Sequence, residues 1–307
     1  MKVALVGYGH LGKWHAEKMN LIYGENFYAI VESDTSKHRT ICEKYPNVRI
    51  VDNLDEVIDT VGAVVIATPT SYHFRIIEKS VMNNKHCFVE KPMTANIEES
   101  FLVGDLLKNK KLIFQVGHSE RFHLFWQHLL RKEEFINASI IRIERLAPYK
   151  GRGDDVDIIY DLMIHDYDLL NMLKIGTPIS VEAWGNSCHT KMIDYCISKI
   201  KYEDKVAFIT ASRSSNKEKR NAEFVFDDGI LELDLMNETV NRSHQGSASE
   251  TLEFQKCDHL LEEHKLFKQS IESKKNNEIN YDIGHESMKL IELTLESIKC
   301  GKAVSWS

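Results

Sequence analysis

Three side chains of this sequence could carry out acid–base chemistry on a hydroxyl group. Lys91 follows the short apolar segment His86 to Val89 and precedes Pro92. Asp161 and His165 are four residues apart, so in a helix they lie on one face. An imidazole with a pKa near ~6.5 can accept a proton at neutral pH, and an ammonium can stabilise a developing alkoxide. We therefore expect His165 to be a general base supported by Asp161, with Lys91 supplying positive charge.

Each of these patterns also has an ordinary structural explanation. An aspartate and a histidine four apart stabilise a helix by ~0.3 kcal/mol, and without Lys91 this explanation of Asp161 and His165 is the better one. A lysine at the end of a strand is a common surface residue. The chemical interpretation therefore depends on the lysine and the pair occurring in one chain.

A glycine-rich turn provides a place for a cofactor. The run Gly7-Tyr8-Gly9-His10-Leu11-Gly12 follows an apolar strand and opens a helix, and Glu32 lies 20 positions after Gly12 at the end of the next strand. Such glycines let backbone N–H groups approach a pyrophosphate, and the acidic residue accepts hydrogen bonds from the adenosine ribose. We expect NAD here, bound through Gly7, Gly9, His10, Leu11, Gly12 and Glu32. A carboxylate opposes the 2′-phosphate of NADP, although Lys37 and Arg39 nearby could accept one.

The elements that must position these residues fall into two regions. Strands alternate with helices up to about Gly117, which indicates a doubly wound parallel (Rossmann) sheet in an α/β domain of residues 1–118. After that point strand-like segments separated by tight turns predict an α+β domain of residues 119–307 with a largely antiparallel, open sheet. A helix from Ile158 to Leu173 would carry Asp161 and His165, and two further helices close the second domain.

Composition excludes several other classes of protein. The 307 residues carry a formal net charge of −7, which argues against nucleic acid as a partner, and no apolar run is long enough to span a membrane. The six cysteines form no C-x-x-C pair and the fourteen histidines no H-E-x-x-H, so we expect no bound metal and no disulfide framework. The first residues do not continue as a signal peptide. A cytoplasmic enzyme is the simplest interpretation.

Several motifs together resemble the Gfo/Idh/MocA family of nicotinamide-dependent sugar and polyol oxidoreductases. They are the glycine turn with His15, the run Ala67-Thr68-Pro69-Thr70-Ser71-Tyr72-His73, the triplet Glu90-Lys91-Pro92, and Asp161-x-x-x-His165. The segments from Val116 to Phe122 and from Arg152 to Asp157 are similar to the branch that contains UDP-N-acetylglucosamine 3-dehydrogenases of cell-envelope synthesis. In place of an acidic residue frequent in the family beside Gly284, this chain has His285.

The resemblance implies an NAD-dependent dehydrogenase that oxidises a secondary hydroxyl of a sugar or nucleotide sugar. It implies that Lys91 contacts both the nicotinamide ribose and the substrate, and that family members assemble as dimers or tetramers. An inositol or other polyol dehydrogenase and an NAD-dependent glycosidase are the alternatives. The further cofactor-binding residues that we expect are Thr68, Pro69, His73 and Glu90. The substrate-binding residues that we expect are Lys91, Asp161, His165, Arg121 and Arg152, where each arginine could instead be a structural ion-pair partner.

Overall fold

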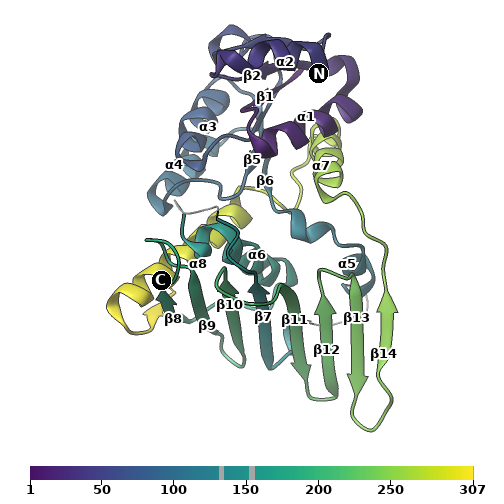
Figure 1. Cartoon of the computed structure of the whole chain (residues 1–307), viewed down its shortest axis with the longest axis vertical. Coiled ribbons are helices and arrows are strands. Elements are labelled where there is room, and N and C mark those ends of the chain that lie inside the picture. Colours follow the sequence, from purple (N-terminus) through teal and green to yellow (C-terminus); the bar gives the residue numbers. More distant parts are fainter. Residues whose placement is uncertain (131–134, 152–155, 307) are drawn as a thin grey trace. The chain divides into compact units, whose positions relative to one another are not determined.

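The chain folds into two compact units (Figure 1). The computed structural model describes residues 1–130, 135–151 and 156–306. The first unit comprises Met1–Ser119 and Asp258–Met288, and the second comprises Glu120–Cys257 and Lys289–Ser307. The sequence prediction put all residues after 118 in the second domain. The structure differs, because residues 258–288 belong to the first unit.

A parallel sheet forms the centre of the first unit. Its six strands have the order β3-β2-β1-β4-β5-β6, with every neighbouring pair parallel. The strands are β1 (Val3–Val6), β2 (Phe27–Val31), β3 (Arg49–Val51), β4 (Ala63–Ile66), β5 (His86–Glu90) and β6 (Phe114–Gly117). The order changes direction between β1 and β4, and in such sheets ligands bind at this point, at the carboxyl ends of the strands. The predicted doubly wound sheet is therefore confirmed, with the additional short strand β3.

Helices cover both faces of this sheet, because alternate residues of a strand point to opposite sides. Ala4 and Val6 enter one apolar cluster, and Val3 and Leu5 enter the other. The helices of the unit are α1 (His10–Tyr23), α2 (His38–Lys44), α3 (His73–Met82), α4 (Ile97–Leu107), α7 (His259–Ser273) and the first part of α8 (Tyr281–Cys300). Figure 1 shows α7 beside α1.

Helix α7 belongs to the first unit because its apolar face completes the core of that unit. Phe267 is fully buried in the cluster that contains Leu5, and its ring lies 5.7 Å from that of Phe88 in an edge-on contact. The periodicity of α7 predicts the helix but contains no information about which domain its buried face contacts.

The second unit is built on a nine-stranded sheet, with the order β14-β13-β12-β11-β7-β10-β9-β8-β15. Neighbours are antiparallel except β7 and β10, which are parallel. The strands are β7 (Ile140–Leu146), β8 (Ser180–Asn186), β9 (Tyr195–Lys201), β10 (Val206–Ser212), β11 (Lys219–Phe226), β12 (Gly229–Asp234), β13 (Thr239–His244), β14 (Glu250–Glu253) and β15 (Val304–Ser305). The helical segments are α5 (Leu124–Leu129), a π-helical turn (Ile159–Met163), α6 (Ile164–Leu173) and the end of α8.

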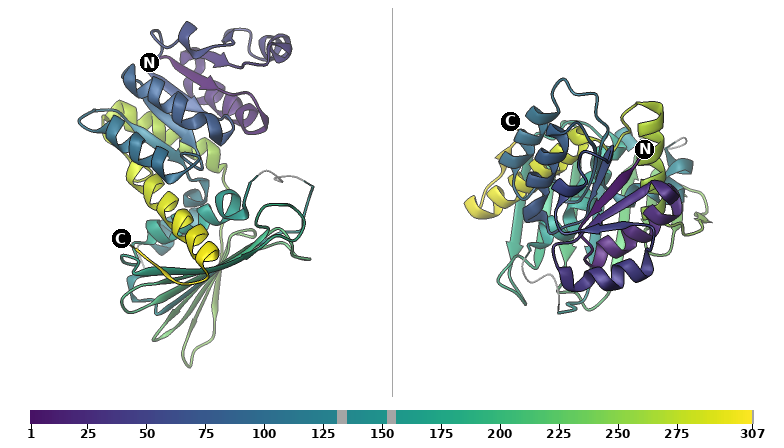
Figure 2. Two further views of the ribbon diagram at one scale, coloured as in Figure 1. Left: turned by 90° about the vertical axis from the view of Figure 1, so that its left-hand side faces the viewer. Right: turned by 90° about the horizontal axis from the view of Figure 1, so that it is seen from above.

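The two faces of this sheet differ in exposure. Leu231 and Leu233 are fully buried, whereas Trp184, Phe208 and Ile230 are at least one-third exposed. Seen on edge in Figure 2, the helices of this unit lie on one side of the sheet, and none of the unit's described helices covers the other. The alternation of leucines with acidic residues in β12 predicts that the leucines form an apolar face that the helices leave partly uncovered. This prediction is wrong, because the leucines are the inward residues of the strand and Ile230 is on the outer face.

None of the helices in the described ranges is both long enough and apolar enough to cross a lipid bilayer.

Candidate active site

The glycine loop after β1 is shaped by backbone contacts that no larger residue would allow. Gly7 has φ +95°, and a Cβ there would lie 2.6 Å from the carbonyl oxygen of Ala67. A Cβ on Gly12 would lie 2.2 Å from the carbonyl oxygen of Gly7. A Cβ on Gly9, by contrast, would meet nothing within 4 Å. Gly7 and Gly12 thus close the turn against β4 and the helix, while Gly9 leaves the space in front of the helix open.

The first turn of α1 is suited to a phosphate. Its N-cap residue is Gly9, which provides no side-chain hydrogen bond, and the turn contains no acidic residue. The N–H groups at the start of a helix have no partner within the helix and attract negative charge. His10 and Leu11 contribute these N–H groups, and the ring of His10 lies against that of Trp14. The loop therefore fits the pyrophosphate of a dinucleotide.

Glu32 is held at the edge of this loop. Its carboxylate accepts hydrogen bonds from the N–H groups of Tyr8 and Asp34, both at 2.9 Å. Lys37 lies 3.3 Å from the same carboxylate and 3.4 Å from that of Asp34. Lys37 is thus already paired with two carboxylates, and Arg39 is paired with Glu43. The negative charges of Glu32 and Asp34 disfavour the 2′-phosphate of NADP, and a ribose hydroxyl would bind Glu32 beside these partners.

The residues after β4 differ in what they offer a cofactor. The hydroxyl oxygen of Thr68 is buried, and within the described part of the chain it has no hydrogen-bond partner. A buried hydroxyl without a partner is costly unless a ligand or water completes it, so Thr68 fits a cofactor contact. Pro69 follows it and is exposed.

His73, for which the sequence predicts a cofactor contact, lies between two backbone segments. Its Nδ1 lies 2.9 Å from the carbonyl oxygen of Pro92, and its Nε2 lies 2.9 Å from that of Thr68. Burial lowers the pKa of His73, so at neutral pH the uncharged ring donates to one of these two oxygens. His73 thus contacts both segments that carry Thr68 and Lys91, and its contact with the cofactor stays a prediction.

Lys91 follows β5 and is half-buried, and the peptide bond between it and Pro92 is cis. Behind it, the carboxylate of Glu90 accepts a hydrogen bond from the Lys91 N–H at 3.2 Å and lies 2.8 Å from Nε2 of His15. Nδ1 of His15 in turn lies 2.9 Å from Nε2 of His264 in α7. Burial alone raises the pKa of Glu90, but the hydrogen bond and charge of His15 outweigh it and lower the pKa. Glu90 is therefore a buried carboxylate that supports the Lys91 backbone, and the cofactor contact that the sequence predicts for it stays a prediction.

Asp161 and His165 occupy a modified helical segment of the second unit. Asp161 lies in the π-helical turn Ile159–Met163, and His165 lies in the first turn of α6. The sequence predicted one regular helix over Ile158 to Leu173. A π-helical turn inserted into an α-helix is rare and occurs frequently at functional sites. Both side chains are half-buried.

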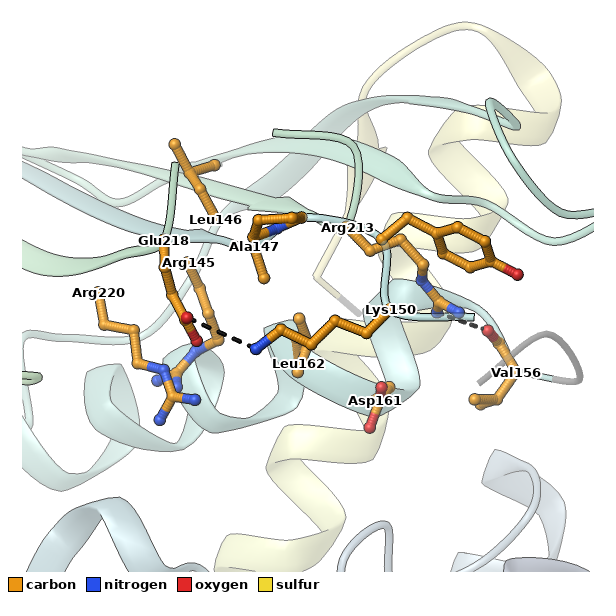
Figure 3. A pocket seen from close by; sticks show the side chains of 12 residues that line it. Arg145, Leu146, Ala147, Lys150, Val156, Asp161, Leu162, Arg213, Glu218 and Arg220 are labelled. Atoms are coloured by element: carbon orange, nitrogen blue, oxygen red, sulfur yellow. Dashed lines mark hydrogen bonds and ion pairs between the residues drawn. The ribbon is translucent and has the colours of Figure 1, made fainter. Parts of the chain in front are cut away.

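A pocket of about 370 Å³ opens beside Asp161 within the second unit (Figure 3). β7 is parallel to β10 and antiparallel to β11, so the last residues of β7 and β10 lie beside the first residues of β11. Residues at these strand ends and in the π-helical turn line the pocket. Four cationic side chains and two carboxylates contribute to its wall, namely Arg145, Lys150, Arg213, Arg220, Asp161 and Glu218. His165 is not part of this wall.

The sequence predicted that Arg121 binds the substrate, but the structure gives its guanidinium another partner. Nε and Nη2 of Arg121 donate to the carboxylate of Asp168 at 2.7 to 3.0 Å, and both side chains are buried. This pair holds the segment before α5 against α6. The other predicted arginine, Arg152, lies outside the described residues.

A second buried ion pair lies under the pocket. Arg145 donates to the carboxylates of Asp166 and Glu120, at 2.8 and 3.0 Å, and is 4% exposed. Burial raises the pKa of Glu120, but the charge of Arg145 and the hydrogen bond from His123 outweigh it and hold the pKa well below its usual value. Burial raises the pKa of Asp166. The guanidinium of Arg145 is thus fixed in place by two acidic groups.

Sequence reasoning missed most of the pocket. Arg145, Lys150, Arg213 and Arg220 come from three separate segments and follow no motif. Only the strand order could have brought them together, and a single sequence does not show strand order.

Comparisons with known proteins agree with the geometry of both units. The model of the oxidoreductase family with an NAD-binding Rossmann fold (GFO_IDH_MocA) matches residues 1–118. UDP-N-acetylglucosamine 3-dehydrogenase of Acidithiobacillus ferrooxidans is 32% identical over 256 residues, which cover 81% of this chain and 79% of that protein. A scyllo-inositol 2-dehydrogenase (NAD(+)) of Bacillus subtilis is 27% identical, covering 70% of this chain and 68% of the relative.

Solved structures extend the similarity to the whole chain. The structure of the Acidithiobacillus ferrooxidans UDP-N-acetylglucosamine 3-dehydrogenase superimposes with a TM-score of 0.91 and 28% identity, covering 98% of each chain. Levoglucosan dehydrogenase in complex with NADH has a TM-score of 0.89 and 15% identity, covering 99% of this chain and 98% of its own, and shares the fold. The glycine loop, Glu32 and the parallel sheet are thus those of an NAD-dependent dehydrogenase acting on sugar hydroxyls, and the chain belongs to the Gfo/Idh/MocA oxidoreductase family.

Proposed function

We propose that the protein is an NAD-dependent dehydrogenase that oxidises a secondary hydroxyl of a nucleotide sugar, as a UDP-N-acetylglucosamine 3-dehydrogenase does. The observation that carries this proposal is the 32% identity to such an enzyme over 79% of its length. The basic pocket beside Asp161 supports it, because a nucleotide sugar is anionic and an inositol is not.

In the proposed mechanism the residues divide the work of alcohol oxidation. The chemistry that bound NAD would supply at this site is a hydride acceptor for the carbon that is oxidised. Lys91 stabilises the negative charge that develops on the substrate oxygen, and its compact ammonium suits a single oxygen atom. His165 accepts the hydroxyl proton, and the carboxylate of Asp161 orients the imidazole and stabilises its charge. Thr68 and Glu32 hold the cofactor, and His73 and Glu90 position the backbone around it.

The test is the absorbance of NADH at 340 nm with NAD and a panel of substrates. We expect absorbance to rise with UDP-N-acetylglucosamine and to stay flat with myo- and scyllo-inositol. The inositol 2-dehydrogenase relative makes a polyol the second candidate, and turnover of inositol alone would favour it. Hydrolysis of a glycoside without net NADH formation would instead identify an NAD-dependent glycosidase.

The proposal includes the setting of the enzyme. We place it in the cytoplasm and its product in cell-envelope sugar synthesis, which cell fractionation and analysis of envelope sugars in a deletion strain would test.

We also propose a homo-dimer or homo-tetramer formed through the outer sheet face, where Trp184, Phe208 and Ile230 are exposed. Light scattering at micromolar concentration should give a multiple of the 35.5 kDa chain mass, and a Phe208→Glu variant should lower it. A monomer mass for the wild type would refute the assembly.

A further inference from the structure

The pocket beside Asp161 contains cations whose present partners hold them only weakly. Lys150 lies 3.5 Å from the carboxylate of Glu218, and both side chains are more than one-third exposed. Arg220 lies 3.6 Å from the carboxylate of Glu120 and is 42% exposed. Ion pairs of this length contribute little when the cation is exposed, and buried Glu120 keeps Arg145 and His123 as partners, so both cations could exchange a carboxylate for a ligand oxygen at small cost. Figure 3 shows Lys150 and Arg220 on either side of Glu218.

The other cations of the pocket are fixed. Arg145 is held by its two buried carboxylates, and Nη2 of Arg213 donates to the carbonyl oxygen of Val156 at 2.7 Å. Buried carboxylates compensate both guanidiniums, namely Asp166 and Glu120 for Arg145 and Asp194 for Arg213, whereas Lys150 and Arg220 are partly exposed. The pocket therefore combines two fixed guanidinium groups with two adjustable cations, an arrangement suited to an anion with several oxygen atoms.

An aromatic side chain completes the pocket. Tyr149 lines it, and its ring is stacked on that of His189 at 5.0 Å with 6° between the planes. The loop that carries His189 is fixed by Asp194, which is fully buried and accepts hydrogen bonds from the N–H groups of Cys188, His189 and Thr190 at 2.6 to 2.8 Å. Burial raises the pKa of Asp194, but these hydrogen bonds outweigh it and lower the pKa. The hydrogen bonds to Asp194 thus fix the position of His189, on which Tyr149 is stacked.

From this arrangement we infer that the pocket binds the nucleoside diphosphate part of the substrate, with Lys150 and Arg220 on the phosphates. The inference rests on the proposed function and names the residues that give it specificity. A volume of about 370 Å³ falls within the range of small-molecule sites, and one carboxylate would leave most of it empty. Asp161, on the wall of the same pocket, is then next to the sugar, and the reacting hydroxyl lies beyond the diphosphate.

The experiment measures UDP binding by isothermal titration calorimetry with NADH at saturating concentration. NADH is present because UDP could otherwise bind at the glycine loop, which also accepts a diphosphate. We expect the wild-type protein to bind UDP, and the affinity to fall as sodium chloride is raised from 50 to 300 mM. Lys150→Ala and Arg220→Ala should each weaken UDP binding about tenfold, whereas Lys150→Arg should retain most of it.

Two matched variants control for the loss of an exposed ion pair. Lys265 pairs with Glu262 in α7, and Arg49 in β3 pairs with Glu56, at exposures similar to those of Lys150 and Arg220. Lys265→Ala and Arg49→Ala should leave UDP binding within twofold of the wild type. In the steady state, Lys150→Ala and Arg220→Ala should raise KM for the nucleotide sugar with little change in kcat, because the phosphates take no part in the chemistry.

Each outcome separates this inference from the proposed function. The inference is overturned if UDP does not bind when NADH is saturating. It is also overturned if the pocket variants and the control variants weaken UDP binding equally. Either result holds even if the enzyme oxidises a nucleotide sugar. Binding of glucuronate without binding of UDP also overturns it, since the pocket would then accept a carboxylate. UDP binding that depends on Lys150 and Arg220, in an enzyme without dehydrogenase activity on UDP sugars, supports the inference and rejects the proposed function.

Discussion

The glycine loop of the first unit and the basic pocket of the second unit are built from different parts of the chain. The loop is a backbone structure, in which the contacts of Gly7 and Gly12 are with carbonyl oxygens and Glu32 is held by two N–H groups. The pocket is a side-chain structure, in which Arg145 is held by Asp166 and Glu120 from other segments.

This difference has consequences for how each region tolerates substitution. In the first unit a side chain that faces the cofactor can be removed without leaving a buried charge. In the second unit the buried cations and carboxylates depend on one another, and removal of one leaves the other uncompensated. We therefore expect substitutions at the cofactor side to change activity with little change in stability, and substitutions among the buried ion pairs of the second unit to change stability first.

The largest effect should follow from Lys91→Ala. Loss of the ammonium removes charge stabilisation in the transition state, and we expect kcat to fall by at least ~10²- to 10⁴-fold with the melting temperature unchanged. Lys91→Arg should not restore the rate, because a planar guanidinium does not replace a compact ammonium at one oxygen. Stopped-flow NADH formation and NAD titration measure the two quantities, with the exposed Lys111→Ala as control. Near-normal turnover with normal NAD affinity would make Lys91 a structural residue.

His165→Ala should have the next largest effect. Loss of a general base lowers kcat by about 10²- to 10⁴-fold, and it should also change the dependence of kcat on pH. The kcat values from pH 5.5 to 9 measure this, with His244→Ala as the control because His244 is an exposed histidine of the same unit. A pH profile that keeps its shape in His165→Ala would assign the base to another group, with Lys91 the first to examine.

The same difference explains how much of the molecule the sequence could predict. The glycine loop, the strands that flank it and Glu32 lie within one contiguous stretch, where local periodicity and glycine spacing carry the information. Helix α7 could be predicted as a helix, but not its packing against Phe88 of the first unit. Arg121 was predicted to bind the substrate because its guanidinium suits an anion, and only the fold shows that Asp168 already occupies it.

Arg121→Ala tests the second unit, where side chains from different segments hold one another in place. The substitution removes the guanidinium that pairs with the buried carboxylate of Asp168, so the free energy of unfolding should fall by about 3–5 kcal/mol. The control is Arg49→Ala, which breaks an exposed pair and should cost no more than about 1 kcal/mol. If Arg121→Ala does not fold, the double variant Arg121→Met with Asp168→Leu removes both charges and should restore much of the stability. A change in KM without a change in urea midpoint would return Arg121 to the substrate site.

Substitutions at two glycines test the glycine loop, which backbone contacts hold in place. A Cβ on Gly9 meets no protein atom, so Gly9→Ala should keep the urea midpoint of the wild type and weaken NAD binding ~10-fold, by filling the space in front of the helix. Gly12→Ala should lower the midpoint as well, because its Cβ meets a backbone carbonyl that cannot rotate away. Calorimetric NAD titration and urea unfolding separate the two effects. Unchanged NAD affinity in Gly9→Ala would contradict the assignment of the loop to the cofactor.

The smallest effect concerns the pH dependence of stability, which should differ between the two units. Burial, with the charges of His15 and Lys18, holds the pKa of His264 well below its ordinary 6.5, and burial lowers that of His73. These histidines are therefore protonated near pH 6.5 in the unfolded chain but not in the folded chain. Their contribution to the free energy of unfolding is full above pH 6.5 and decreases below it. In the second unit the lowered pKa of Glu120 gives stability that is complete above about pH 4.5 and is lost only below it.

The pH window of the buried histidines can be measured in the full chain. Urea unfolding at pH 7.5, 6.5 and 5.5 should show stability falling by up to about 1.4 kcal/mol per pH unit for each buried histidine. His264→Phe keeps a ring among Tyr23, Phe88 and His15 but cannot be protonated, so it should be less stable than the wild type at pH 7.5 and lose less stability by pH 5.5. His10→Phe, at an exposed position, should keep the slope of the wild type. If the free energy of unfolding changes equally with pH in all three proteins, His264 is protonated as readily in the folded chain as in the unfolded one. The hydrogen-bonded residues Glu90 and His15 would then stabilise its charge.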